Sequence, residues 1–338
     1  MDWSKGFSAS YYLSVVDRNS WRDGDRINIT GGTIKRTYGD LRESADIDCV
    51  NYEYLDSEQI IRVWLDARQE GSSSHTPIFT GVASSPGRNI NGRLETNTLQ
   101  CYSILKIAQD VLLPRGWYAP ADANGASLIK SLLSVIGLPN DMLHITENSN
   151  TLKTSIIAEE GENHLSMVDK ILYAMNWRMS LNGKGEITIE PITYDPVVIF
   201  SSLDNDVIET SLSVTYDWYN CPNVYRAVVD DISAVAIDDS PDSPYSTVNR
   251  GREIWYEDIN CYLNENESLS DYARRKLKES QRVSYILSYI RRFDPSVRVD
   301  DVVTINYPEQ KIFGNYLVTD QTIQLTHGGE TTEEAMKI

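Results

Sequence analysis

Alternating apolar and polar residues recur through the first hundred positions of the chain. This pattern, or a short apolar run, is seen in Tyr11–Val16, Arg26–Thr30, Asp46–Tyr52, Ile60–Leu65 and Pro77–Val82. Successive side chains on a strand point to opposite faces, so these segments predict half-buried β-strands. Gly31-Gly32 after the second segment predicts a turn. We therefore expect an antiparallel sheet or barrel in this part of the chain.

The middle of the chain changes to helical spacing, and residues near 97–195 predict a small α/β unit. Apolar residues lie on one helical face in the segments Leu105–Leu112, Gly125–Gly137 and Glu162–Asn176. Trp177–Leu181 and Glu186–Pro191 then flank the turn Asn182-Gly183-Lys184-Gly185, which predicts a β-hairpin.

The remainder returns to strand patterns, so a β-domain is expected at each end of the chain. Predicted strands are Val207–Tyr216, Asn223–Val229, Val283–Arg291, Val299–Asn306 and Tyr316–Leu325. The Asp-, Ser- and Pro-rich segment Ile237–Ser246 favours a loop. Ser268-Leu269-Ser270-Asp271 predicts a helix start of the capping-box type, with Asp in the place of Glu or Gln.

Charge is distributed unevenly. The chain has 31 basic and 49 acidic residues, a net charge of −18, which argues against nucleic-acid binding. From Asp195 to Asp271 there are 16 acidic and 3 basic residues, whereas Tyr272–Arg292 holds 7 basic and 1 acidic. One explanation is a solvated acidic surface beside a helix whose Arg and Lys pair with it. The other is complementary surfaces between copies of the subunit.

Several classes of function find no support. The sequence has no apolar run of about 18 residues, so membrane insertion is not expected. It shows no secretion signal, so the chain is expected to fold in a cytoplasm or to leave it by a route other than the general secretory signal. Its cysteines, Cys49, Cys101, Cys221 and Cys261, lack CxxC spacing and are expected to be reduced and mostly buried. Its histidines, His75, His144, His164 and His327, match no metal-ligand spacing. Phosphate-loop, dinucleotide and serine-hydrolase motifs are absent too. We predict no catalytic, cofactor-binding or metal-binding residues.

Three chemistries stay open at this level: glycan hydrolysis, sugar binding and cation binding. A glycosidase pair of carboxylates is not excluded, because sequence does not show which acids lie about 5–10 Å apart. The 7 Trp and 20 Tyr residues suit sugar stacking, although packing in sheets is the more common role of such residues. Asp204-Asn205-Asp206 and Asp238-Asp239-Ser240-Pro241-Asp242 are candidates for a hard cation, with solvated loop acids as the default.

Three stretches resemble hub proteins from the tails and baseplates of long-tailed bacteriophages and related contractile injection particles. The stretches are Pro77–Ala83 with Gln100–Leu105, Leu165–Asn176 with Trp177 and Gly183–Ile187, and Phe293–Val303 with Gly314–Val318. They are similar to a strand closing the family's first sheet, to its middle helix and hairpin, and to the closing strands of its second barrel. Where the family often has Gly-Asp before the closing strand, this chain has Asp300-Asp301.

The resemblance implies a β-rich α+β multidomain protein, in which two tube-like antiparallel β-barrel domains flank a small α/β domain. The implied domains are 1–112, 113–195 and 196–338, the last with an acidic loop insertion and a helix. Three copies would form a ring that adapts a six-fold tail tube to a three-fold spike or fibre.

The implied partners are a tail tube or distal tail protein, a spike or fibre protein and a tape-measure protein, in a virion tail assembled in the host cytoplasm. DNA would pass through the bore, so we expect acidic residues to line it, with Asp230, Asp231, Asp238, Asp239 and Asp242 as candidates. The alternatives are a carbohydrate-binding or adhesive tail component and, after that, a cell-wall glycan hydrolase.

Overall fold

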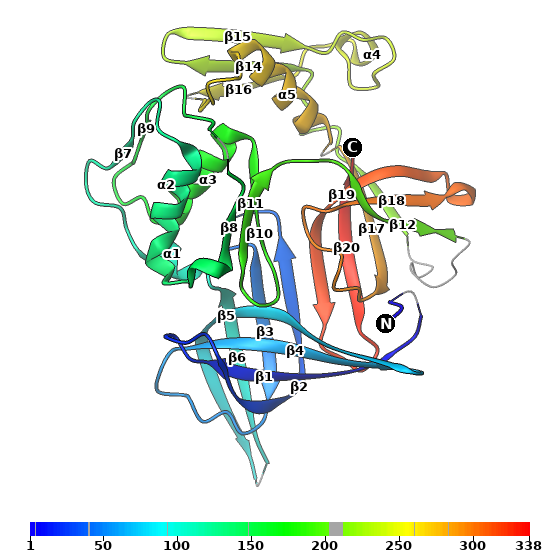
Figure 1. Ribbon diagram of the computed structural model, residues 1–338. Helices are drawn as coiled ribbons and strands as arrows, with labels where there is room; N and C mark the ends of the chain where they lie inside the picture. Colours follow the sequence, from blue (N-terminus) through cyan, green and yellow to red (C-terminus); the bar gives the residue numbers. More distant parts are fainter. Residues whose placement is uncertain are drawn as a thin grey trace.

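The computed structural model describes residues 1–3, 5–39, 41–92, 94–147, 149–202, 212–259, 261–282 and 284–338. Twelve strands form one sheet, which falls into two halves of six strands each (Figure 1). The expected β-rich α+β class is confirmed. No described helix has the length and apolar character needed to cross a membrane.

The first half of the sheet is a closed ring of six strands. Pairing runs in the order β1–β4–β5–β6–β3–β2 and returns to β1. The strands are β1 (Ser8–Val16), β2 (Asp23–Thr37), β3 (Glu43–Cys49), β4 (Gln59–Gln69), β5 (Ser72–Asn91) and β6 (Leu94–Ser103). Alternate residues such as Leu13, Val63 and Phe79 fill the interior of the ring. The strands predicted in this region are all present, with shifted ends.

The turn predicted at Gly31-Gly32 is wrong, because β2 continues through both glycines. The register of β2 against β3 shifts between Ile29 and Gly31, which marks a β-bulge. Gly32 has φ 131°, and a Cβ atom there would lie 2.2 Å from the backbone oxygen of Asp46. Glycine therefore lets one long strand bend away from β1 and carry its pairing into the second half.

The second half of the sheet has the strand order β12–β18–β19–β20–β17–β13. Its strands are β12 (Pro196–Ser201), β13 (Ser213–Tyr216), β17 (Tyr285–Arg292), β18 (Val302–Tyr307), β19 (Ile312–Gln324) and β20 (Glu330–Lys337). A short 3-10 helix, Pro308–Gln310, joins β18 to β19. Strand β19 pairs with β18 through its first part and with β2 through its last part, so it joins the two halves.

Two predicted strands of this half reach beyond the described residues. Residues 207–211 of the strand predicted over Val207–Tyr216 lie outside them, and β13 is the described part. Val283 also lies outside them, so the strand predicted from there is described as β17. Strand β20, whose residues include three glutamates, was not predicted.

Buried polar side chains form a ladder across the join between the two halves. Neighbouring strands β17, β20, β19, β2 and β3 contribute Arg291, Glu333, Gln321, Arg36 and Glu43, all buried. Arg291 donates to Glu333 over 2.8 and 2.5 Å, and Gln321 donates to Glu333 over 2.6 Å. Arg36 donates to the Gln321 carbonyl oxygen over 2.8 Å, and its Nε atom lies 2.9 Å from a Glu43 oxygen in an ion pair. We call these five residues the polar ladder.

The middle of the chain forms a small helical unit on one side of the ring. It contains α1 (Lys106–Asp110), α2 (Gly125–Leu133), α3 (His164–Met175), the sheet of β8 (Leu143–Ile145), β10 (Trp177–Leu181) and β11 (Ile187–Pro191), and the pair β7 (Tyr118–Ala119) and β9 (Ile156–Ile157). Two 3-10 helices, Ser134–Ile136 and Asn140–Met142, complete it. The three predicted helices and the hairpin are present, although α1 is shorter than expected.

An insertion lies between β13 and β17, which pair with each other at its base through Tyr216 and Tyr285. It holds β14 (Val224–Val229), β15 (Ile232–Ile237), α4 (Thr247–Arg250), β16 (Trp255–Ile259) and α5 (Leu269–Arg282). Helix α5 covers one face of the three-stranded sheet (Figure 1). Ser268 caps the start of α5 as predicted, because the Asp271 amide donates to the Ser268 hydroxyl, and this hydroxyl donates to the Asp271 carboxylate. Strands β15 and β16 were not predicted.

Removing one charge from the polar ladder should destabilise the protein more than removing two. Arg291→Met leaves the buried Glu333 carboxylate without its cation, which should cost about 3–5 kcal/mol of unfolding free energy. Arg291→Met combined with Glu333→Leu should recover part of that loss, because no unpaired charge remains. Urea unfolding of the two variants and the wild type measures both effects. A double variant less stable than the single one would contradict this account.

Candidate functional site

The turn between β10 and β11 rests on the outer surface of the ring. Thr80 of β5 donates to the Gly183 carbonyl over 2.7 Å, and Arg62 of β4 donates to the Lys184 carbonyl over 3.1 Å. The Asn182 side chain accepts from the backbone amides of Lys184 and Glu186 and so holds the turn in shape. This contact fixes the helical unit against the ring.

Gly183 makes this contact possible. A Cβ atom at this position would lie 1.8 Å from the Pro77 carbonyl oxygen, which no side-chain movement relieves, because the atom belongs to the backbone. The glycine-bearing turn in the sequence is therefore more than a hairpin connection.

A second junction surrounds Asp300, which is buried where the ring, the helical unit and the second half of the sheet meet. Arg42, in the loop after β2, lies 3.6 Å from the Asp300 carboxylate and 3.3 Å from that of Asp169 on α3. Arg178 of β10 donates to the Asp300 carbonyl over 2.6 Å. Burial raises the pKa of the Asp300 carboxyl to about 6, against the opposing effect of Arg42 and Arg178. One residue thus connects three parts of the molecule.

The backbone of Asp300 explains the departure from Gly-Asp. Its φ is 73°, in the left-handed region that favours glycine and that aspartate tolerates better than most residues. The turn geometry that glycine would provide is therefore present with an aspartate.

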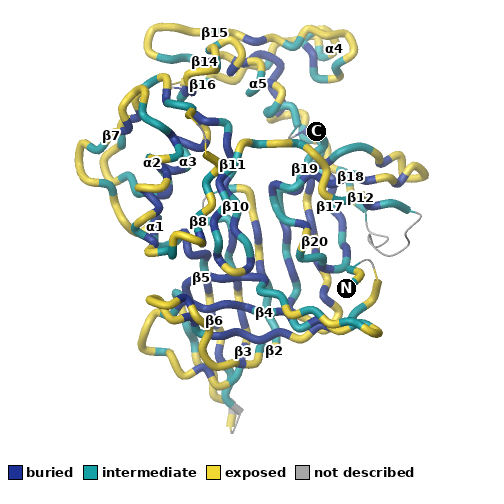
Figure 2. The backbone as a smooth tube through the Cα atoms, viewed as in Figure 1, coloured by how far each residue is buried: buried dark blue, intermediate teal, exposed yellow. Residues whose placement is uncertain are grey.

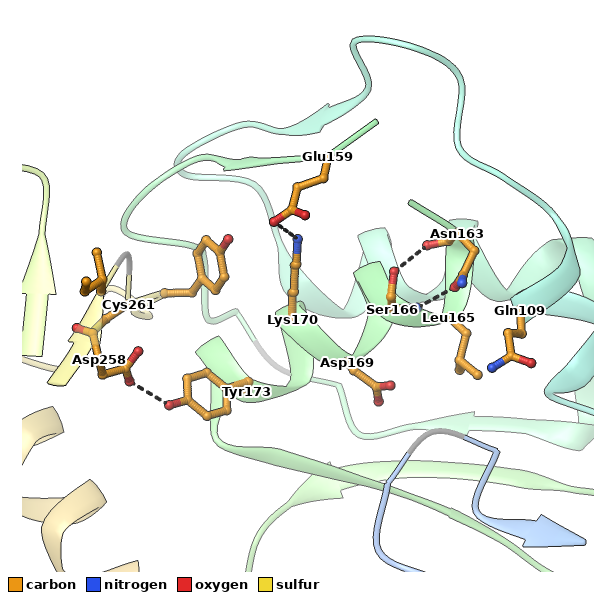
Figure 3. Close-up of a pocket in the computed structure, with 12 residues that line it drawn as sticks. Gln109, Glu159, Asn163, Leu165, Ser166, Asp169, Lys170, Tyr173, Asp258 and Cys261 are labelled. Carbon is orange, nitrogen blue, oxygen red and sulfur yellow. Dashed lines mark hydrogen bonds and ion pairs between the residues drawn. The ribbon is translucent and has the colours of Figure 1, made fainter. Parts of the chain in front are cut away.

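A cavity of about 600 Å³ lies between α3 and β16 (Figure 3). Three tyrosine hydroxyls converge on one carboxylate oxygen of Asp258 beside it, from Tyr173 at 3.0 Å, Tyr225 at 2.8 Å and Tyr272 at 2.6 Å. Tyr173 belongs to the helical unit, whereas the other two belong to the insertion. Asp258 therefore holds the insertion against α3.

Lys170, Cys261 and Ser166 of this cavity are held in forms that are poor bases or nucleophiles. Burial opposes the charge of Lys170, but its hydrogen bond to Glu162 outweighs that effect and raises the pKa of the ammonium group. Burial raises the pKa of the Cys261 thiol to about 11, so the thiolate that attacks electrophiles is scarce at neutral pH. The Ser166 hydroxyl donates to Glu162 and is not activated by a base such as histidine.

The histidines and cysteines are scattered through the fold. His75 bonds Asp66 and Tyr12 on the ring, His164 bonds the Leu132 carbonyl, His327 bonds the Ala9 carbonyl, and His144 lies exposed on β8. All four cysteines are buried and unpaired, as expected. Among the described residues, no group of three or more His, Cys, Asp or Glu side chains is placed to hold a metal ion.

The five candidate bore residues do not form one patch. Asp230 and Asp231 form the turn between β14 and β15, whereas Asp238, Asp239 and Asp242 follow the far end of β15. The Asp238 carboxylate accepts from Ser243 and Gln281, so it closes a loop of the insertion. The other four are exposed. The other cation candidate, Asp204-Asn205-Asp206, lies outside the described residues.

Known proteins resemble this chain in structure rather than in sequence. Neither a protein-family model nor a curated protein matches it. A tail protein from Neisseria meningitidis matches with a TM-score of 0.70 and 13% identity, over 98% of this chain and 97% of its own. The 43 kDa tail protein of prophage MuSo2 from Shewanella oneidensis matches with 0.68 and 11%, over 98% and 97%.

This chain has the fold of these tail proteins.

A third structure extends the comparison to a secretion system. An Escherichia coli component of the type VI secretion system, itself structurally similar to the bacteriophage T4 tail proteins gp27 and gp5, matches with a TM-score of 0.51 and 9% identity. The match covers 92% of this chain and 74% of that one. The resemblance drawn from the sequence is thus confirmed at the level of the fold.

The sequence did not indicate the residues that organise the tail-protein fold here. Arg36, Arg42 and Glu333 lie in segments for which the sequence predicted no strand or helix. Gly183 and Asp300 could be singled out from the sequence, because each lies in one of the three stretches that resemble tail hub proteins.

Gly183→Ala should detach the helical unit from the ring. The added Cβ atom forces the hairpin away from Pro77, with an expected loss of about 1–3 kcal/mol of unfolding free energy. Gly6→Ala is the matched control, because nothing lies within 4 Å of a Cβ atom there. Thermal unfolding of both variants measures the difference, and equal effects would show that the hairpin contact is not needed.

Asp300→Asn should change how stability depends on pH. The folded-state pKa of about 6 lies above the usual value near 4, so the folded protein binds this proton more tightly than the unfolded chain. The stabilisation that this proton gives to the folded protein is therefore present at low pH. As pH rises from about 4 to about 6, the free energy of unfolding falls by up to about 3 kcal/mol. Urea unfolding should show this loss in the wild type relative to the variant. The exposed-site control Asp56→Asn should follow the wild type, and parallel curves for Asp300→Asn would contradict the assignment.

Proposed function

We propose that this chain is a structural hub subunit of a phage-type tail or baseplate and that it forms a homotrimeric ring. The likeness to tail proteins over nearly the whole chain supports this proposal. The division of the sheet into two halves of six strands supports the trimer. Three copies with two halves each present six similar units, which is the number that a six-fold tail tube requires.

In this proposal the closed ring of β1–β6 is the first tube-like β-barrel domain, within 1–112. The strands β12, β13 and β17–β20 build the second, within 196–338, and residues 113–195 form the small α/β domain between them. The trimeric ring of three chains adapts the tail tube to a three-fold spike or fibre. Its other partners are a distal tail protein and a tape-measure protein, and the assembled particle is a virion tail formed in the host cytoplasm.

The proposed role is not enzymatic. The cavity beside α3 supports this view, since Lys170 is held as an ammonium group by Glu162 and Cys261 as a thiol by burial. DNA or the tape measure would pass through the bore of the ring. The assignment of exposed aspartates to that bore stays a prediction, and it requires them to face the ring axis.

The native mass of the purified protein tests the proposal. Three chains of 38.3 kDa should give a discrete species of about 115 kDa, ring-shaped in electron micrographs, in a concentration series by light scattering or native mass spectrometry. A monomer at all concentrations would argue against self-assembly of the free chain. Glycan affinity, or clearing of a cell-wall substrate that one carboxylate variant abolishes, would favour the adhesive or the hydrolase alternative.

A further inference from the structure

Helix α5 carries a row of positive charges that the chain itself leaves largely unneutralised. Arg274, Lys278 and Arg282 are spaced four residues apart and so lie along one face of the helix. Among the described residues, Lys278 and Arg282 form no ion pair, and the pair of Arg274 with Asp271 is an exposed contact of 3.4 Å. Such an exposed pair contributes little. We call these three residues the basic stripe.

The neighbouring charges of α5 are already satisfied. Arg275 bonds Glu267 over 2.8 Å and Glu279 over 3.1 Å, and Lys276 bonds Glu279 over 2.8 Å. Pairing within the chain therefore accounts for these two cations but not for the basic stripe.

The basic stripe lines a cavity of about 670 Å³ between α5 and the end of β15. The Arg282 guanidinium lies 4.3 Å from the centre of the Tyr194 ring, which holds it at the cavity wall. Ile237 and Leu277 add apolar surface. The acids that line the cavity are occupied, Asp238 by Gln281 and Ser243, and Glu279 by Arg275 and Lys276. The cavity is therefore suited to an external group with negative charge and an apolar flank.

The turn between β14 and β15, at the opposite end of the same insertion, offers negative charge beside apolar surface. Asp230 and Asp231 are adjacent and exposed, and neither forms an ion pair with a described residue. The following residue, Ile232, is 70% exposed, and Figure 2 shows the strand β15 as largely exposed. The two-residue turn, closed by the pairing of Val229 with Ile232, fixes the carboxylates in place and lowers the entropy cost of binding.

The turn does not reach the cavity of its own chain. The pairing of β14 with β15 places Val229 and Ile232 at one end and Val224 and Ile237, which borders the cavity, at the other. The ends are about 17 Å apart at the usual rise of a strand. A contact between turn and cavity must therefore join two copies, and such a head-to-tail contact closes into a ring when the rotation permits.

Charge favours a second copy as the occupant. Each chain has a net charge of −18, so copies repel one another except where a positive surface meets a negative one. We propose that the Asp230–Asp231 turn of one copy binds in the basic-stripe cavity of the next copy. This contact rests on the ring of the proposed function, and it gives Asp230 and Asp231 a position between subunits instead of in the bore.

Charge reversal with rescue tests the contact. Asp230→Lys with Asp231→Lys should raise the dissociation constant of the oligomer by about tenfold or more, and so should Arg274→Glu with Lys278→Glu and Arg282→Glu. The five substitutions together should restore association. Glu53→Lys with Asp56→Lys, at exposed ring-loop positions, changes the net charge as much as the turn variant and should leave association unchanged. Native mass across a concentration series is the readout.

A cross-link provides a second readout that needs no charge reversal. Asp231→Cys with Lys278→Cys in one chain should give covalent dimers and trimers on oxidation, because a disulfide needs Cα atoms within about 7 Å. Either single variant should give none, since the native cysteines are buried. An intact wild-type oligomer with silent charge reversals and no cross-link would overturn the contact and leave the hub proposal standing. A wild-type monomer at every concentration would overturn the contact and would argue against self-assembly of the free chain.

Discussion

The polar ladder is the constraint on which the rest of the fold depends. It runs through five neighbouring strands and crosses the pairing of β2 with β19, which is the strand pairing that joins the two halves of the described sheet. A slip of one residue would turn Gln321 to the other face of the sheet and leave the Glu333 and Arg36 charges without it in a buried environment. The ladder therefore sets the register of the join, and with it the relative position of the two halves.

The other units attach to this frame through polar contacts at few points. The helical unit is held by the turn at Gly183 and by the charges around Asp300, and the insertion is held by the tyrosines around Asp258. Each contact joins groups with defined directions. Apolar packing contributes as well, because the core of the helical unit includes Val16, Trp21 and Ile60 of the ring. Apolar packing therefore holds the units together, and directional polar bonds set their relative orientation.

The sequence predicted the elements whose burial alternates regularly, and it missed those whose burial depends on a distant partner. Most of the ring strands and the three helices of the middle unit follow their periodicity. Strand β20 contains Glu330, Glu333 and Glu334, and burial of Glu333 depends on the Arg291 cation on β17 and on the Gln321 amide on β19. The glycines of β2 were predicted to end a strand, because a bulge and a turn require the same residue.

The charge pattern of the sequence also did not reveal which charged residues would be paired in the folded chain and which would be left on its surface. The acidic segment and the basic segment are adjacent in the sequence, and pairing between them does occur, as Arg275 with Glu267 shows. The fold nevertheless separates the cations of α5. Arg275 and Lys276 pair with acids of the same chain, whereas the basic stripe borders an open cavity without such pairing. A count of acidic and basic residues along the chain does not separate the paired charges from the unpaired ones. In a subunit of net charge −18, the positive charge that stays unpaired on α5 is small and localised, and it is the part available to select an acidic partner.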